Sequence, residues 1–296
     1  MKITQILKKE EKKLLLFCGP FLVIYIMFFV FPLVDGVIMS FTNTNGFTDV
    51  YDIVYFDNYI KLLTNDERFH ASFTRTIIFT VINVVVGNFL ALLLAFVIES
   101  GIRGKRFFRT MFFLPYVFAL IIIGFTWKFI FVQWIPEIGE LLQIKFLIQD
   151  YLGNPKIALY SVIIMQIWYQ LGYYLVIYIA GMQSIDTTIV EATEIDGANT
   201  FQKYTKVVMP LLYPAMSICI FTGLASSLKA FDAVLALTGG GPGYATEVIS
   251  LNIYYEAMGE AQQYGYGMAK SIVLAIFIFA VTAVQRKFFE KREVEA

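Results

Sequence analysis

The sequence predicts an all-α integral membrane protein with six transmembrane helices. Of its 296 residues, 58% are hydrophobic and only 16% are charged, whereas an ordinary soluble domain is about 25% charged. The mean hydropathy is +0.68. Six stretches contain the roughly 20 apolar residues that a helix needs to cross a bilayer core. This composition excludes a disordered chain and argues against a soluble globular protein.

The six expected spans cover residues 13–39, 72–98, 107–132, 157–182, 211–237 and 267–287. The first span follows a lysine-rich start and could be mistaken for a signal peptide. Its apolar run is longer than the core of a signal peptide, and no small-x-small cleavage site follows it, so we expect it to be retained.

Lysine and arginine are distributed unequally between the two sides of these spans. Since cytoplasmic loops carry the excess of Lys and Arg, the richer side predicts the cytoplasm and places both termini there. The richer side holds Lys2, Lys8, Lys9, Lys12, Lys13, Arg103, Lys105, Arg106, Arg109, Lys203, Lys206, Arg286, Lys287, Lys291 and Arg292, and the other side holds Lys61, Arg68, Lys145 and Lys156.

The polar outer loop 40–71 divides the chain. We expect an N-terminal segment 1–71 with the first span, a five-helix core 72–288, and a cytoplasmic tail 289–296. Equal numbers of acidic and basic residues give no reason to expect a nucleic-acid partner. The six apolar spans predict that the chain is surrounded by membrane lipid. We expect His70 at the surface, Cys18 and Cys219 as small buried hydrophobes, and neither a catalytic nor a metal site.

The segment 184–209 is too polar to cross the membrane and is typical of a helical hairpin. Thr188 and Glu191 have the spacing of a capping box, and Gly197 suits the left-handed conformation that ends a helix. The hairpin is either a simple interfacial link or a docking element. With one apolar face and three acidic residues, it suits a helix-in-groove contact with a soluble partner.

The hairpin carries a family resemblance. The run consists of Glu191, Ala192, Thr193, Glu194, Ile195, Asp196, Gly197 and Ala198. It resembles the EAA motif of permease subunits of binding-protein-dependent ABC importers, with Thr193 in place of the second Ala. Leu114-Pro115-Tyr116 and the run from Phe231 to Gly243 resemble the carbohydrate-uptake branch, in particular the larger permease of maltose and multiple-sugar importers.

This resemblance implies a type I ABC importer permease fold with a cytoplasmic coupling helix. It implies that the ATPase contact is made by Glu191, Ala192, Glu194, Asp196 and Gly197. The implied partners are a second permease subunit, two copies of an ATPase that binds ATP and Mg, and an extracytoplasmic sugar-binding protein, which the 239–243 loop would touch. The chain itself would hold no cofactor.

Polar and aromatic residues inside the spans are the candidates for a substrate pathway. Gln166, Tyr169, Gln170 and Tyr173 share one helical face, where amides and rings suit the hydroxyls and apolar face of a sugar. An interfacial aromatic belt with amides between helices is the alternative. Asn83 and Asn88 are expected to form such interhelical hydrogen bonds.

Lys229 interrupts the fifth span and has Asp232 three residues on, which places both on one helical face. This pair could support the fold, contact substrate, or couple an ion. The family resemblance implies a substrate pocket formed by Tyr116, Gln166, Gln170, Tyr173, Ser227 and Lys229.

We therefore expect a transmembrane subunit of an ATP-driven importer that moves a sugar, preferably an oligosaccharide, across the cytoplasmic membrane by alternating access. The chain is not expected to be an enzyme, because ATP hydrolysis belongs to the partner. The alternative is an ion-coupled secondary transporter or channel without an ATPase. An intramembrane enzyme would need more than the single His70.

Overall fold

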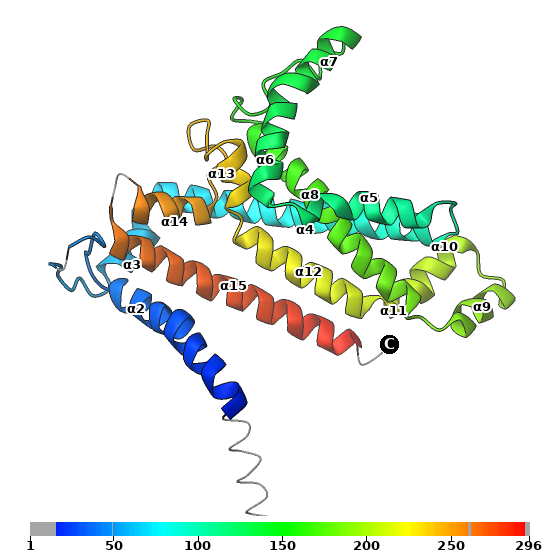
Figure 1. Ribbon diagram of the computed structural model, residues 1–296, viewed down its shortest axis with the longest axis horizontal. Coiled ribbons are helices and arrows are strands. Elements are labelled where there is room, and N and C mark those ends of the chain that lie inside the picture. Colours follow the sequence, from blue (N-terminus) through cyan, green and yellow to red (C-terminus); the bar gives the residue numbers. More distant parts are fainter. Residues whose placement is uncertain (1–15, 49, 260–261, 294–296) are drawn as a thin grey trace, which may run out of the picture. The chain divides into compact units, whose positions relative to one another are not determined.

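The computed structural model describes residues 16–48, 50–259 and 262–293, which are mostly helical (Figure 1). Within these residues, the only β pairing is an isolated bridge between Thr42 and Ile53. The chain forms two compact units. The described residues up to Asp66 and the segment Ile253–Val273 form the first, and Glu67–Asn252 together with the described residues from Leu274 onward form the second.

The first unit begins with an apolar helix over Leu16–Met39, which includes the π-turn η1 (Ile26–Val30) and α2 (Phe31–Met39). A short irregular segment leads to α3 (Asp57–Thr64). Cys18 is exposed on the apolar helix, so its expected burial is wrong, because no residue of Leu16–Met39 is buried by the described part of the chain. In lipid, an uncovered apolar helix needs no protein cover.

A buried ion cluster lies in the first unit. The Lys270 side chain is 0% exposed, and its Nζ lies 2.8 Å from a carboxylate oxygen of Asp66 and 2.8 Å from one of Glu256. Tyr266 donates its hydroxyl to Asp66 over 2.7 Å. A buried charge is unfavourable unless it is paired, so these two carboxylates stabilise the buried ammonium group of Lys270.

The core of the second unit is built on two long helices, α4 (Glu67–Glu99) and α8 (Ala158–Gln183), which pack against each other. The helices α5 (Lys105–Val117) and α12 (Tyr213–Leu228) pack on α8 and α4 respectively (Figure 1). Small residues allow close approach: a Cβ at Gly172 of α8 would meet the backbone of Phe112 in α5. The buried core includes Ala91, Leu175 and Cys219, as expected for Cys219.

Apolar side chains cover the outside of these helices. Val81, Val85 and Phe89 on α4 are each more than half exposed and recur every four residues, which forms a lipid-facing stripe. Five described helices are long and apolar enough to cross a membrane: Leu16–Met39, Glu67–Glu99, Leu120–Leu142, Ala158–Gln183 and Tyr264–Glu290. The number is six if Thr200–Leu211 and Tyr213–Leu228, bent by 69° at their junction, count as one span.

The expected third span, 107–132, is wrong as a single helix. The chain breaks at Phe118 and Ala119, whose backbones are extended, starting three residues after Pro115. Pro115 itself lies inside α5, and the helix ends with the Phe118 N–H donating to the Pro115 carbonyl over 3.2 Å. A new helix starts with α6 (Leu120–Phe129) and continues through the π-turn η2 (Ile130–Trp134) into α7 (Ile135–Leu142).

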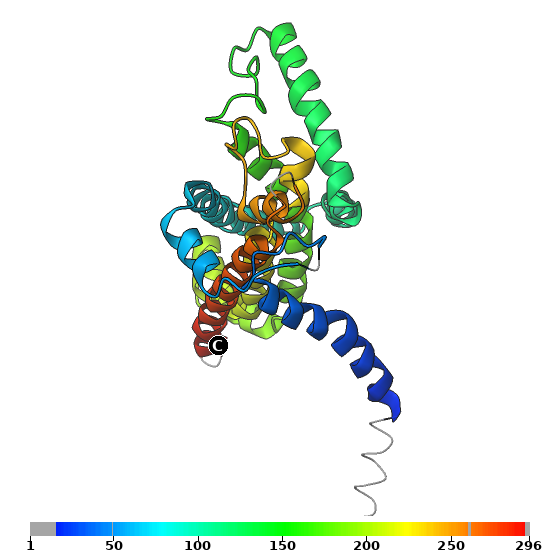
Figure 2. The same ribbon diagram turned by 90° about the vertical axis from the view of Figure 1, so that its left-hand side faces the viewer.

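The expected fifth span, 211–237, is also interrupted. Helix α12 ends at Leu228, and the short helix α13 (Asp232–Leu237) starts after an irregular turn and packs against α6 (Figure 2). Lys229 and Asp232 are therefore not on one helical face, and among the described residues no ion pair joins them. The helices α14 (Ile249–Met258) and α15 (Tyr264–Glu293) complete the chain.

Candidate functional site

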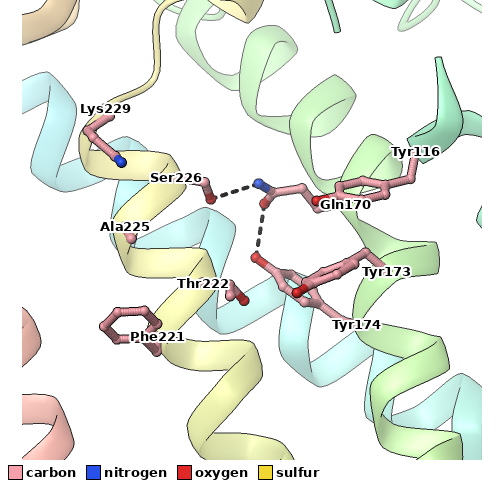
Figure 3. A pocket seen from close by; sticks show the side chains of 9 residues that line it. All are labelled: Tyr116, Gln170, Tyr173, Tyr174, Phe221, Thr222, Ala225, Ser226 and Lys229. Carbon is pink, nitrogen blue, oxygen red and sulfur yellow. Dashed lines mark hydrogen bonds between the residues drawn. The ribbon is translucent and has the colours of Figure 1, made fainter. Parts of the chain in front are cut away.

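A cavity of about 250 Å³ lies in the second unit between α5, α8 and α12 (Figure 3). Its lining consists of Tyr116, Gln170, Tyr173, Tyr174, Phe221, Thr222, Ala225, Ser226 and Lys229. The breaks after α5 and after α12 place the ends of these two helices at the cavity, since Tyr116 and Lys229 lie at those ends.

Aromatic rings form one wall of the cavity. The rings of Tyr116 and Tyr173 are stacked with centroids 4.7 Å apart and planes at 24°. Tyr169 also packs against Tyr116, with the two ring centroids 5.2 Å apart. Its hydroxyl donates to the Phe118 carbonyl over 3.2 Å, which ties the break after α5 to α8. The wall therefore depends on how α5 packs on α8.

The polar wall of the cavity centres on Gln170, which lies on α8 beside these rings and faces Ser226 of α12. Its Nε2 donates to the Ser226 hydroxyl over 2.8 Å, and its Oε1 accepts from the Tyr174 hydroxyl over 3.0 Å (Figure 3). Asn83 of α4 also donates to Gln170 Oε1 over 2.8 Å and to the Ser227 hydroxyl over 2.7 Å. The interhelical hydrogen bonding expected of Asn83 is confirmed.

The structure brings four of the eight predicted substrate residues into the lining, namely Tyr116, Gln170, Tyr173 and Lys229. Tyr169 stacks behind this lining. Gln166 and Ser227 are buried outside it, and the buried Gln166 Oε1 has no hydrogen-bond partner among the described residues. Asp232 is exposed and does not line the cavity, because the turn after α12 separates it from Lys229.

Five lining residues are not among the predicted substrate residues: Tyr174, Phe221, Thr222, Ala225 and Ser226. A signal for part of this set was present. Thr222, Ser226 and Lys229 are spaced four and three residues apart, which places them on one helical face. Phe221 and Ala225 carry no such signal, because apolar residues inside an apolar span do not stand out.

The expected hairpin forms two short helical segments. The first is α9 (Thr187–Ile195), and Gly197 takes the left-handed conformation with φ of 77°. The second runs through α10 (Thr200–Gln202), the π-turn η3 (Lys203–Val208) and α11 (Met209–Leu211). Glu191, Ala192, Asp196 and Gly197 are exposed, whereas the side chain of Glu194 lies outside the described part of the chain.

The expected capping box of Thr188 and Glu191 is wrong. Thr188 lies inside α9, and its backbone N–H donates to the Asp186 carboxylate over 2.9 Å. This hydrogen bond lowers the pKa of Asp186 below its usual range. The capping box lies instead at α10, where Asn199 and Gln202 exchange side-chain to backbone hydrogen bonds of 2.9 and 3.0 Å. Asp186, which precedes α9, accepts a hydrogen bond from a backbone N–H of the first turn, and this is the role that the expected capping box gave to Thr188.

Large apolar side chains on the hairpin face away from the protein. Ile195 is 86% exposed and Phe201 is 77% exposed. Leaving such side chains uncovered outside the lipid is unfavourable, so this surface has the character of a contact surface.

The loop between α13 and α14 is anchored by a buried carboxylate. Glu247 is fully buried and accepts from Arg68 Nε over 2.9 Å, from Arg68 Nη2 over 2.5 Å, and from Asn252 Nδ2 over 2.8 Å. The glycine run 239–243 has no Lys-Ser or Lys-Thr after it and forms a turn in which Thr246 donates to the Gly241 carbonyl. Within the described residues, no group of His, Cys, Asp or Glu side chains could hold a metal.

Broken apolar helices around a cavity lined by aromatic and polar side chains define the class: the chain is a multi-pass helical membrane protein with a site between its helices. It belongs to the family described as the binding-protein-dependent transport system inner membrane component, which it matches over residues 87–293. This confirms the family that the hairpin motif predicts.

Two relatives match nearly the whole chain. The chain is 36% identical over 280 residues to the probable starch degradation products transport system permease protein AmyD of Thermoanaerobacterium thermosulfurigenes, with 95% of this chain and 94% of that protein covered. It is 36% identical over 273 residues to the multiple sugar-binding transport system permease protein MsmF of Streptococcus mutans, with coverage of 92% and 93%.

A solved structure shares the fold. It is a chain in the crystal structure of a bacterial alginate ABC transporter in complex with an alginate pentasaccharide-bound periplasmic protein. The TM-score is 0.81 at 20% identity, with 96% of this chain and 97% of that chain covered. The likeness confirms the expected ABC importer permease fold.

Proposed function

We propose that this chain is one transmembrane subunit of an ATP-driven importer that moves an oligosaccharide across the cytoplasmic membrane by alternating access. The observation that carries the proposal is the cavity between α5, α8 and α12. Its stacked tyrosines offer ring faces to the apolar face of a sugar, and Gln170, Thr222 and Lys229 offer hydrogen-bond groups to its hydroxyls. The names of AmyD and MsmF support a carbohydrate substrate.

The exposed hairpin supports an ATPase partner. Glu191 lies on α9 and Gly197 in the turn that follows it, with uncovered apolar side chains nearby, which suits docking into a groove of a soluble subunit. In this proposal two ATPase copies bind ATP and Mg, and this chain holds no cofactor. Their closure moves the hairpin and, through α8 and α12, opens the cavity to the other side.

The remaining partners follow from the same proposal. A second permease subunit completes the pathway, and an extracytoplasmic sugar-binding protein delivers the substrate, as the periplasmic protein bound to the alginate transporter suggests. The excess of Lys and Arg on one side places both termini in the cytoplasm. An ion-coupled secondary transporter loses its main support, because Lys229 and Asp232 do not form the expected pair.

The test is a mild-detergent purification of the chain from its native membrane, followed by reconstitution into vesicles. We expect a second permease and an ATPase to co-purify, and uptake of radiolabelled maltotriose, raffinose or alginate pentasaccharide to require ATP and a binding protein. Glu191→Ala is expected to abolish ATP-dependent uptake while the complex still assembles. Glu140→Ala, which removes an exposed helical carboxylate outside the hairpin, is the matched control and should leave uptake unchanged.

Uptake driven by an ion gradient, with no ATPase recovered, would refute the proposal. Full ATP-dependent uptake by the Glu191→Ala variant would instead refute the docking role of the hairpin.

A further inference from the structure

Asn83 is a fully buried amide that lies directly behind the cavity. It belongs to α4, and no atom of it lines the cavity, so it cannot touch a bound substrate. Its two N–H groups are both used, one toward Gln170 Oε1 at 2.8 Å and one toward the Ser227 hydroxyl at 2.7 Å. Asn83 thereby links α4 to both helices that form the polar wall.

These contacts determine what Gln170 presents to the cavity. A side-chain amide has one oxygen with two acceptor positions and one nitrogen with two N–H donors. Gln170 Oε1 is saturated by Asn83 and by the Tyr174 hydroxyl, and Nε2 uses one N–H toward Ser226. The second N–H of Gln170 is therefore the part of this amide that remains for a ligand. If the Gln170 amide were rotated by half a turn, its Nε2 would face the Asn83 Nδ2 donor, and two donors cannot form a hydrogen bond with each other.

We propose that Asn83 is a positioning residue for substrate recognition: by donating to Gln170 Oε1, it holds the free N–H of Gln170 toward the cavity as a donor to a sugar oxygen. This inference rests on the proposed function. The recognised group is an acceptor oxygen, namely a hydroxyl or ring oxygen of the sugar, because no acceptor position of Gln170 remains open.

Asn88 shows that a buried amide on α4 can serve packing alone. Its Oδ1 accepts from the Tyr178 hydroxyl over 2.7 Å, and its Nδ2 donates to the Val84 carbonyl over 2.7 Å. None of these residues lines the cavity. Asn88 is thus a matched control for Asn83: the same residue type on the same helix, buried and bonded between helices, but without a link to Gln170.

The experiment compares Asn83→Leu, Gln170→Ala, the double variant and Asn88→Leu in the intact reconstituted transporter. The probe is the panel of radiolabelled maltotriose, raffinose and alginate pentasaccharide, and the readouts are KM and maximal rate per assembled complex. We expect Asn83→Leu to raise KM about tenfold, which corresponds to about 1.4 kcal/mol, with the maximal rate nearly unchanged. In the Gln170→Ala background, the same change should leave KM nearly unaltered, because the proposed effect of Asn83 on substrate binding is exerted through Gln170.

Four results decide the question. An unchanged KM for Asn83→Leu overturns the inference, as does an equal rise in KM with and without Gln170. An equal rise in KM for Asn88→Leu shows a structural effect only and also overturns it. An unchanged KM for Gln170→Ala would show that this cavity does not bind the substrate and would contradict the proposed function itself. If Asn83→Leu does not assemble, Asn83→Ser replaces it, since serine keeps one donor, and the same comparisons apply with a smaller rise in KM.

Discussion

Replacing Gly172 with alanine tests how closely α5 and α8 must approach for the cavity to form. A Cβ atom at Gly172 would lie 2.0 Å from the carbonyl oxygen of Phe112 and 2.5 Å from its carbonyl carbon. Because Cβ contacts below 3.0 Å are essentially absent from proteins, the α5 backbone would have to retreat by about 1 Å. The obstacle is backbone, so rotation of a side chain cannot relieve it.

Two opposing effects set the size of the change. Overpacking costs about 1 to 3 kcal/mol, whereas alanine gains about 0.5 to 1 kcal/mol over glycine in a helix interior. The overpacking term is larger here, so we expect Gly172→Ala to lower the free energy of unfolding by about 1 to 2 kcal/mol. Since α5 carries Tyr116, its retreat would also disturb the ring stack with Tyr173 and raise the KM for sugar.

Thermal melting of the purified complex and uptake kinetics provide the assay. Gly87→Ala is the matched control, because its nearest heavy atom, Cε2 of Tyr174, would lie 3.5 Å from the added Cβ, an ordinary contact. The control should melt at or above the wild-type temperature with the same KM. Equal melting temperatures and equal KM values for the two variants would show that α5 and α8 do not pack this closely.

Two further predictions concern buried charges. Glu247→Gln removes the ion pair between Glu247 and the half-exposed Arg68 and should destabilise the protein by about 1 to 3 kcal/mol, measured by thermal melting. An unchanged melting temperature would mean that Glu247 does not anchor the loop between α13 and α14. Lys270→Met removes the cation that pairs with the carboxylates of Asp66 and Glu256 and should lower the free energy of unfolding by about 3 to 5 kcal/mol. Its melting temperature should be partly restored by adding Glu256→Gln, and a Lys270→Met protein as stable as wild type would contradict the ion cluster.

Local patterns in the sequence were sufficient for several features. Apolar runs identified the membrane-crossing character, and the hairpin residues from Glu191 to Gly197 identified the family. Helical spacing placed Gln170 and Tyr173 near each other on α8, because a regular helix determines which residues share a face. These features depend on residues close together along the chain.

The interruptions of the third and fifth spans did not follow from the sequence. Phe118 and Lys229 lie within apolar runs, and hydropathy does not distinguish a continuous helix from two packed pieces. Pro115 lies before the first break, but a proline disturbs the helical turn that precedes it, so it does not predict a break after it. The second break, between α12 and α13, has no comparable proline or glycine, so packing of α13 on α6 decides it.

The sequence by itself determined that this chain is a helical membrane protein of the permease family, because apolar length and a short motif are local properties. Only the tertiary structure decided which residues form the cavity and how they are oriented. Asn83 and Gln170 are 87 residues apart in the sequence, yet one hydrogen bond joins them. Such a contact depends on how α4 packs on α8, and the pattern of neither helix alone contains that information.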